Sequence, residues 1–239
     1  MSESSQLPNP FEEALLSPKL GGTELYFIRH ADALPGADEV VRGHYDEQPL
    51  SELGRKQAGA VAERLRGAEL NAVYSAPLGR ARATAEAIAA AAGLTVRVDA
   101  GLREVELGTL EAEVAEHVSA EEFAEALRKR LREIATIALA NGGWSTVPGA
   151  EPSAALRARL REAVAAIVAR HAGERVALVT HAGSINAWFA DALGIQHDYF
   201  FPTANTAISL ARVRGDAVLV FALNDISHLR AAGLTMPGI

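Results

Sequence analysis

Apolar and polar residues form short blocks along this chain, and their spacing predicts strands and helices in alternation. Apolar runs rich in β-branched and aromatic residues, bounded by turn-forming residues, are typical of buried strands. Apolar residues spaced three and four positions apart, opened by Ser and closed by Gly, are typical of amphipathic helices. The predicted strands cover residues 24–28, 71–74, 94–98, 175–180, 206–213 and 217–223. The predicted helices cover residues 51–66, 78–92, 119–141, 153–172 and 184–193.

This order of elements predicts an α/β fold. Strands that alternate with helices favour a three-layer sandwich, in which a mainly parallel sheet carries helices on both faces and ends in a C-terminal antiparallel hairpin. We expect one domain over residues 23–239, with a small helical insertion at about 113–147. Residues 1–22 are rich in Ser, Pro and Gly and are expected to form a flexible N-terminal arm.

Composition restricts the classes of function. The chain has 239 residues, of which 49% are hydrophobic, and this suits one sizeable core. A net charge of -7 argues against a nucleic-acid-binding surface, because phosphate backbones bind to basic faces. The chain has no Cys, and therefore no disulfide, no thiolate nucleophile and no Cys-bound metal.

Signals for secretion or membrane insertion are missing from the sequence. Residues 1–9 are polar and lack the basic start and apolar stretch of a signal peptide. No apolar run approaches the roughly 20 residues of a membrane-spanning helix. We therefore expect a cytoplasmic protein that partners neither membrane nor nucleic acid. The sequence leaves the oligomeric state open, a homodimer included.

Two histidines follow predicted strands in the same way. His30, preceded by Arg29, ends the run at 24–28, and His181 ends the run at 175–180. Ligands bind to α/β sheets at the carboxyl ends of the strands. One such histidine indicates little by itself, whereas two at matching strand ends, with an arginine beside one of them, predict a site.

Arg80 adds a second positive charge to this edge. Residues 75–77 lead from a strand into a helix, so Arg80 falls in the first helical turn, near free backbone N–H groups that bind anions. A cation at this position opposes the helix dipole, which favours an anionic partner. One arginine guanidinium can bind two phosphate oxygens at once, and a neutral imidazole is a competent nucleophile near pH 7. Together these groups predict phosphoryl transfer through a phosphohistidine.

A leaving alkoxide needs a proton, and the segment after the strand at 94–98 supplies two carboxyl groups. If this segment is extended, Glu104 and Glu106 point to the same side. A carboxyl group with a raised pKa is a suitable proton donor. Asp32 is a third candidate donor, and ion pairing with nearby arginines is the alternative role for either glutamate.

Four blocks of the sequence resemble the histidine phosphatase superfamily, also called phosphoglycerate-mutase-like. Counterparts of the family's Arg-His-Gly signature, Ser-Pro-Leu-x-Arg-Ala block, Leu-x-Glu element and Val-x-His-Gly-Gly block occur here in the family's order. The counterparts are Arg29-His30-Ala31, residues 76–85, Leu102-Arg103-Glu104 and residues 179–183. The resemblance extends from about residue 24 to residue 228.

The resemblance implies roles for individual residues. It makes His30 the nucleophile and Glu104 the proton donor. It places Arg29, Arg80 and His181 in the phosphate pocket, with catalytic as well as binding roles.

Two further substrate contacts are expected, and several positions depart from the family pattern. Arg42 falls in a loop where the family often adds a phosphate contact, and Ala182 adjoins His181 in the last block. Alanine stands at positions 31, 33, 83 and 182, where family members have Gly, Ser or Thr, Gln, and Gly. These replacements predict a pocket with fewer hydroxyl contacts. The family often shapes its specificity in the inserted helical segment.

The resemblance leaves three functions open. We expect a phosphatase that hydrolyses phosphomonoesters, because residues 223–229 resemble the tail of broad phosphatases in this family. A phosphoglycerate mutase would use the same phosphohistidine and return the phosphate to a bound product. A catalytically weak module that binds or scaffolds phospho-ligands is the alternative from another class.

A metal site is a weaker interpretation of the same histidines. The pairs His30-x-Asp32 and His44-x-Asp46 have spacings that suit Zn, Mn or Fe, but the arginine-rich blocks have no part in such a site. No glycine-rich nucleotide-binding motif follows a strand. We therefore expect no metal and no cofactor, and a small phosphorylated molecule as the substrate.

Three other residues receive structural interpretations. Ser184 follows His181 at the start of a predicted helix and is expected to cap it. Trp144 and Trp188 are expected to be packing residues.

Overall fold

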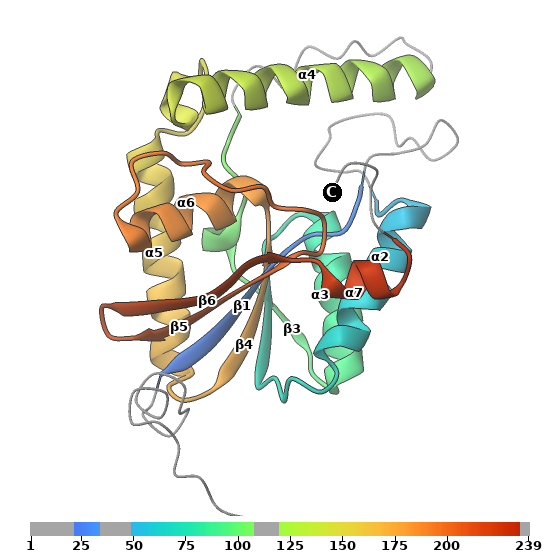
Figure 1. Ribbon diagram of the computed structural model, residues 1–239, viewed down its shortest axis with the longest axis vertical. Helices are drawn as coiled ribbons and strands as arrows, with labels where there is room; N and C mark the ends of the chain where they lie inside the picture. Colours follow the sequence, from blue (N-terminus) through green and yellow to red (C-terminus); the bar gives the residue numbers. More distant parts are fainter. Residues whose placement is uncertain (1–21, 34–48, 108–119, 235–239) are drawn as a thin grey trace, which may run out of the picture.

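One six-stranded sheet between helices forms the part of the chain that the computed structural model describes, residues 22–33, 49–107 and 120–234 (Figure 1). The strands are β1 (Thr23–Arg29), β2 (Ala72–Ser75), β3 (Val96–Val98), β4 (Arg175–Thr180), β5 (Ile208–Arg214) and β6 (Ala217–Asp225). The helices are α2 (Glu52–Leu65), α3 (Gly79–Ala92), α4 (Ala120–Asn141), α5 (Ser153–Arg170), α6 (Ala182–Leu193) and α7 (Ser227–Ala231). Short 3₁₀ turns are η3 (Ala100–Leu102) and η5 (Trp144–Thr146).

The sheet has the strand order β3-β2-β4-β1-β5-β6. Strands β1 to β4 pair in parallel, and β5 pairs antiparallel with both β1 and β6. Helices α2 and α3 cover one face, and α5 and α6 cover the other (Figure 1). The predicted three-layer α/β fold with its C-terminal antiparallel hairpin is confirmed.

The central strands are buried on both faces. Leu25 and Ile28 of β1 and residues 176–179 of β4 have no exposed surface. Parallel strands covered by helices on both faces have continuous apolar runs in their sequence, because no side of the strand faces solvent. This is the physical reason why the runs at 24–28 and 175–180 stand out in the sequence.

Local capping places the first helix against the loop after β1. The Ser51 side chain accepts a hydrogen bond from the Gly54 N–H at 3.0 Å and so caps α2, as predicted. A Cβ at Gly54 would lie 1.9 Å from the carbonyl oxygen of Asp32, so glycine is required for this close approach. The first turn of α2 therefore packs directly on the loop that follows His30.

Two helices differ from the prediction. Helix α6 begins at Ala182, earlier than expected, and His181 occupies its N-cap position without a side-chain cap bond. Ser184 is therefore not the cap, and its hydroxyl donates instead to the carbonyl oxygen of Arg103 at 2.7 Å. This bond links residues far apart in the sequence, so local propensity could not indicate it. Helix α7 spans five residues, too few to give a periodic pattern.

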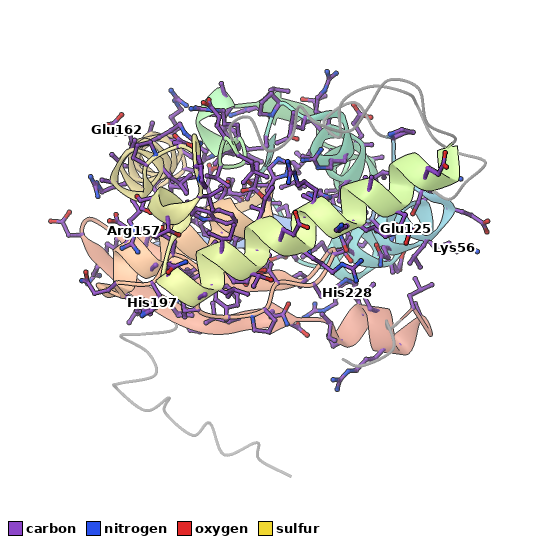
Figure 2. All side chains as sticks on the ribbon, turned by 90° about the horizontal axis from the view of Figure 1, so that it is seen from above. Lys56, Glu125, Arg157, Glu162, His197 and His228 are labelled. Carbon is purple, nitrogen blue, oxygen red and sulfur yellow. The ribbon has the colours of Figure 1, made fainter. Side chains whose placement is uncertain are left out.

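Helix α4 is the described helical part of the predicted insertion. It crosses above the edge where the parallel strands end (Figures 1 and 2). Residue 119, where the predicted helix begins, lies outside the described residues. The division into an arm and one domain stays a prediction. No helix in the described ranges is long and apolar enough to cross a membrane.

Candidate active site

The two strand-end histidines lie side by side. Strands β1 and β4 are neighbours with Arg29 opposite Thr180, so the next residues, His30 and His181, leave the sheet at the same edge. Their ring centroids are 5.0 Å apart, with an angle of 58° between the rings. Exposure is 3% for His30 and 0% for His181. The predicted convergence of these two residues is therefore present.

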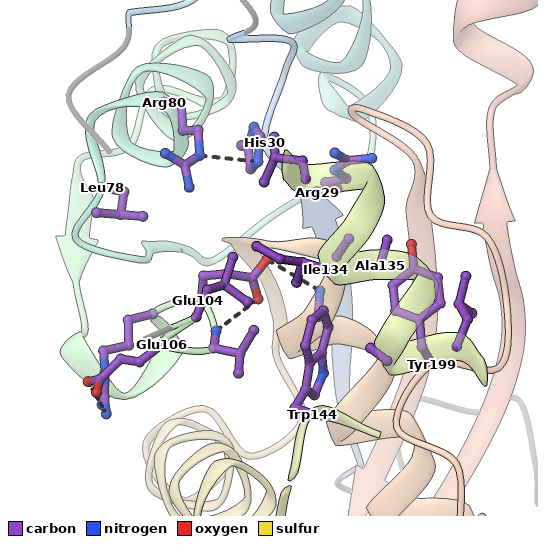
Figure 3. Close-up of a pocket in the computed structure, with 18 of the residues that line it drawn as sticks. Arg29, His30, Leu78, Arg80, Glu104, Glu106, Ile134, Ala135, Trp144 and Tyr199 are labelled. Carbon is purple, nitrogen blue, oxygen red and sulfur yellow. Dashed lines mark hydrogen bonds and ion pairs between the residues drawn. The ribbon is translucent and has the colours of Figure 1, made fainter. Parts of the chain in front are cut away.

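Hydrogen bonding determines which nitrogen of His30 can react. Nδ1 lies 2.7 Å from the carbonyl oxygen of Ala31, which can only accept a hydrogen bond, so Nδ1 carries the proton. Nε2 then keeps its lone pair. The Nε of Arg80 donates to this Nε2 at 3.3 Å (Figure 3). The reactive nitrogen is thus held beside a guanidinium group.

Both histidines are held in the neutral form. Burial, followed by the charge of Arg80, lowers the pKa of His30 and of His181 well below the usual 6.5. The charge of Arg29 acts in the same direction on both. Both ring nitrogens of His181 are buried without a hydrogen-bond partner among the described residues. Such groups are costly to leave unpaired, which favours a ligand that supplies the missing bonds.

Two arginines flank the histidine pair. Arg80 is the second residue of α3, in its first turn as predicted, and is 2% exposed. Arg29 ends β1, and its Nη1 donates to the carbonyl oxygen of Thr203 at 2.6 Å. A buried guanidinium group at a helix N-terminus and a half-buried one at a strand end suit a phosphate group.

The Glu104 side chain contacts the first turn of α6. One carboxylate oxygen accepts from the N–H groups of Val105 and Ser184, each at 3.0 Å, and the other accepts from the Gly183 N–H at 3.3 Å. Burial raises the pKa of Glu104, although these hydrogen bonds and the charge of Arg80 act in the opposite direction. A Cβ at Gly183 would lie 2.7 Å from the carboxylate, so glycine makes room for it.

The other two carboxyl candidates are placed differently. Residues 103–107 form no strand, and the Glu106 side chain is 67% exposed and paired with Arg103 at 3.1 Å. Asp32 accepts a hydrogen bond from the Ser51 hydroxyl at 2.6 Å and lies outside the described cavity lining. Glu104 has a raised pKa and shares the cavity lining with His30 (Figure 3).

The alanines that depart from the family pattern divide into two groups. Ala31 and Ala33 are buried and pack with Leu50 and Ala58 at the α2 side of the loop. Neither belongs to the described cavity lining, whereas Ala182 does. The replacement at position 31 therefore affects packing against α2 more than the wall facing a substrate. Arg42 lies outside the described residues.

A cavity of about 660 Å³ opens beside these groups (Figure 3). This volume exceeds what a phosphate group alone requires. Its described lining comprises Arg29, His30, Pro77, Leu78, Arg80, Arg103, Glu104, Val105, Glu106, Leu107, Leu131, Ile134, Ala135, Ala138, Leu139, Trp144, Ala182, Gly183 and Tyr199. Trp188 packs on Phe27 in the core, as expected, while Trp144 combines packing with a place in the cavity wall.

Sequence reasoning missed three residues that hold the site in position. Arg159 of α5 donates to the carbonyl oxygens of Gly101 and Arg103 at 2.8 and 3.0 Å. Asp198 accepts from the Trp144 N–H at 3.1 Å. Asn205 donates to the carbonyl oxygen of His30 at 2.9 Å. Each acts across a long sequence separation, so no local pattern indicates it.

The metal site that the sequence analysis gave as a weaker interpretation of these histidines can be compared with the described residues. Among the described residues, no group of three or more His, Asp or Glu side chains is arranged to hold a metal ion. His44 and Asp46, the second pair of that weaker interpretation, lie outside those residues.

The fold agrees with comparisons across the chain. The model of the histidine phosphatase superfamily (branch 1) matches residues 25–226. The chain belongs to this superfamily.

The relatives include a probable phosphoglycerate mutase and a phosphatase. A probable phosphoglycerate mutase, GpmB, from Yersinia enterocolitica is 32% identical over 172 residues, covering 72% of this chain and 75% of the relative. The structure of Bacillus stearothermophilus YhfR is 27% identical, with a TM-score of 0.67, and covers 87% of this chain and 99% of that one. A mycobacterial glucosyl-3-phosphoglycerate phosphatase is 28% identical, with a TM-score of 0.62, over 85% of this chain and 99% of that one.

Proposed function

We propose that this protein is a metal-independent phosphatase that hydrolyses phosphomonoesters through a phosphohistidine at His30. The observation that carries the proposal is a buried pair of neutral histidines with the Arg80 Nε 3.3 Å from His30 Nε2. Glu104, with its raised pKa, completes the set. Phosphoryl transfer requires a neutral nucleophile, cations beside the phosphate oxygens and a proton donor, and these groups can supply all three.

The first half of the reaction transfers the phosphoryl group to the protein. Nε2 of His30 attacks phosphorus, and the bond from phosphorus to the alcohol oxygen breaks. Glu104 gives its proton to that oxygen, so a neutral alcohol leaves. Arg29, Arg80 and His181 stabilise the charge on the remaining phosphate oxygens.

The second half returns the site to its starting state. Glu104, now ionised, takes a proton from a water molecule as the water oxygen attacks phosphorus. The bond from phosphorus to Nε2 breaks, which releases inorganic phosphate and restores neutral His30. The same carboxyl group thus serves as acid and then as base.

A phosphoglycerate mutase is the second candidate, because the GpmB relative is 32% identical to this chain. A mutase would carry the same phosphohistidine but pass the phosphoryl group back to a bound product. Its turnover would depend on a bisphosphoglycerate primer, and simple hydrolysis would be slow.

A panel of phosphomonoesters tests the proposal. Wild-type protein is expected to release phosphate with EDTA present and without bisphosphoglycerate, and to form an acid-labile phosphate on His30. His30→Ala is expected to abolish both. His197→Ala removes an exposed histidine outside the described cavity lining and serves as the matched control with unchanged rates.

Each competing function has its own outcome. Loss of hydrolysis in EDTA would contradict metal independence. Turnover that requires bisphosphoglycerate would identify a mutase. Tight phosphate binding without labelling of His30 would indicate a binding module.

A further inference from the structure

The wall of the cavity away from the residues proposed to bind phosphate is mostly apolar. Helix α4 contributes five apolar side chains, and Figure 3 shows two of them, Ile134 and Ala135, beside the space between Glu104 and Tyr199. Trp144 and Tyr199 form an aromatic corner, with ring centroids 6.4 Å apart and an angle of 84°. The α4 side chains in the lining are Leu131, Ile134, Ala135, Ala138 and Leu139.

Leu139 is exposed although it belongs to this wall. Its relative exposure is 53%, one of the highest among large apolar side chains in the described structure. Leucine at a cavity rim gains free energy when an apolar ligand covers it. The wall therefore favours an apolar occupant over water.

The charges of the lining also favour an uncharged alcohol group on the substrate. In the proposed reaction Arg29 and Arg80 bind the phosphoryl group. The remaining described cation, Arg103, is already paired with Glu106 at 3.1 Å and with Glu151 at 3.4 Å. A second negative charge on a substrate would thus meet the Glu106 carboxylate, and the described lining offers it no further cation, which is unfavourable.

We propose, on the basis of the function above, that the preferred substrates are phosphomonoesters of uncharged, largely apolar alcohols. The alcohol is an aryl or medium-length alkyl group that lies against the inner face of α4 and the Trp144–Tyr199 corner. The cavity volume of about 660 Å³ has room for such a group beside the phosphate. Substrates with a carboxylate on the alcohol are disfavoured.

A series of primary alkyl phosphates tests this assignment. Ethyl, butyl and hexyl phosphate have leaving alcohols of similar acidity, so differences in kcat/KM report binding of the chain. We expect kcat/KM to rise by about fourfold per methylene group until the wall is covered. A hexyl phosphate that bears a terminal carboxylate is expected to be about tenfold poorer than hexyl phosphate itself.

Two matched lysine variants locate the effect. Leu139→Lys places a cation in the cavity wall, whereas Leu193→Lys alters a leucine of α6 that is 44% exposed and lies outside the described lining. We expect Leu139→Lys to flatten the chain-length series and to favour the carboxylated substrate. Leu193→Lys is expected to behave as the wild type.

The outcomes separate this inference from the function on which it rests. If His30 becomes labelled and hydrolysis occurs, but the alkyl series is flat or the carboxylated substrate is preferred, only the leaving-group assignment is wrong. If neither labelling nor hydrolysis of any phosphate occurs, the proposed function is wrong and this inference falls with it.

Discussion

Single atoms decide the chemistry available to His30 and Glu104. The Ala31 carbonyl fixes the proton on Nδ1 of His30, which leaves Nε2 as the nucleophilic atom. Burial raises the pKa of Glu104 by more than the hydrogen bonds that it accepts lower it. Both effects come from the immediate neighbours of each side chain, so conservative substitutions can test them.

Glu104→Gln is expected to separate the two halves of the reaction. The phenolate of p-nitrophenyl phosphate leaves without protonation, so the variant still forms phospho-His30 and releases a burst of product equal to the enzyme concentration. The second half lacks its base, and steady turnover falls by about 10²- to 10⁴-fold. Rapid-mixing absorbance measurements check this.

Hexyl phosphate provides the contrast, because its alkoxide needs a proton and no burst is expected. Glu106→Gln changes the exposed neighbour and is the control. Equal, undiminished turnover of both substrates by Glu104→Gln would show that another group moves the proton.

At the level of elements, α5 holds the segment that carries Glu104. Arg159 contacts the carbonyl oxygens of Gly101 and Arg103 and also binds both carboxylate oxygens of Glu151, at 2.6 and 3.0 Å. The Arg159 and Glu151 side chains are largely buried. One guanidinium group thus ties η3 and the residues after it to a rigid helix, which preorganises the carboxyl group.

Arg159→Lys is expected to loosen this segment, because a lysine ammonium cannot reproduce the planar set of bonds. A misplaced Glu104 would lower kcat by about 10- to 100-fold. Better solvation would bring its pKa down towards 4.5. Since Glu104 must be protonated in the first half, the basic limb of the pH–rate profile moves to lower pH.

The measurement is kcat and kcat/KM against pH for the wild type and two variants. Arg161→Lys, in the same helix, alters an exposed ion pair with Asp191 and is the control. A fall in stability without movement of the basic limb would assign Arg159 a structural role alone.

For the whole molecule, buried histidines couple stability to pH. Burial lowers the pKa of His30, His181 and His228, so the unfolded chain takes up protons below about pH 6.5 that the folded protein does not. Glu104 partly offsets this, because its raised pKa lets the folded state bind a proton first. The net expectation is a loss of stability as pH falls below 6.5.

Each histidine contributes a slope of up to about 1.4 kcal/mol per pH unit. His228 lies outside the cavity lining, so His228→Gln removes one such group while leaving the proposed chemistry in place. Denaturant unfolding between pH 7.5 and 5.5 is expected to give a shallower pH dependence for the variant than for the wild type. Parallel curves would show that His228 does not contribute.

The elements next to the site were predictable to different degrees. The long buried strands β1 and β4 and the helices with clear caps or αL ends, α2 and α3, follow from local patterns. The start of α6 was misplaced because the Ser184 side chain bonds across the structure to Arg103 and Glu104 rather than to its own helix. Glu106 was a plausible partner for Glu104 only on the assumption of an extended segment, which does not form.

The sequence alone determined that Arg29, His30 and His181 lie at the carboxyl ends of buried strands and that Arg80 lies in the first turn of a helix, because strand burial and helix initiation are encoded by neighbouring residues. Tertiary structure decided the rest. It set the neutral state of the histidines, the raised pKa of Glu104, the packing of Ala31 against α2 and the apolar wall formed by α4. These properties depend on burial and on contacts between distant segments, which exist only once the chain has folded.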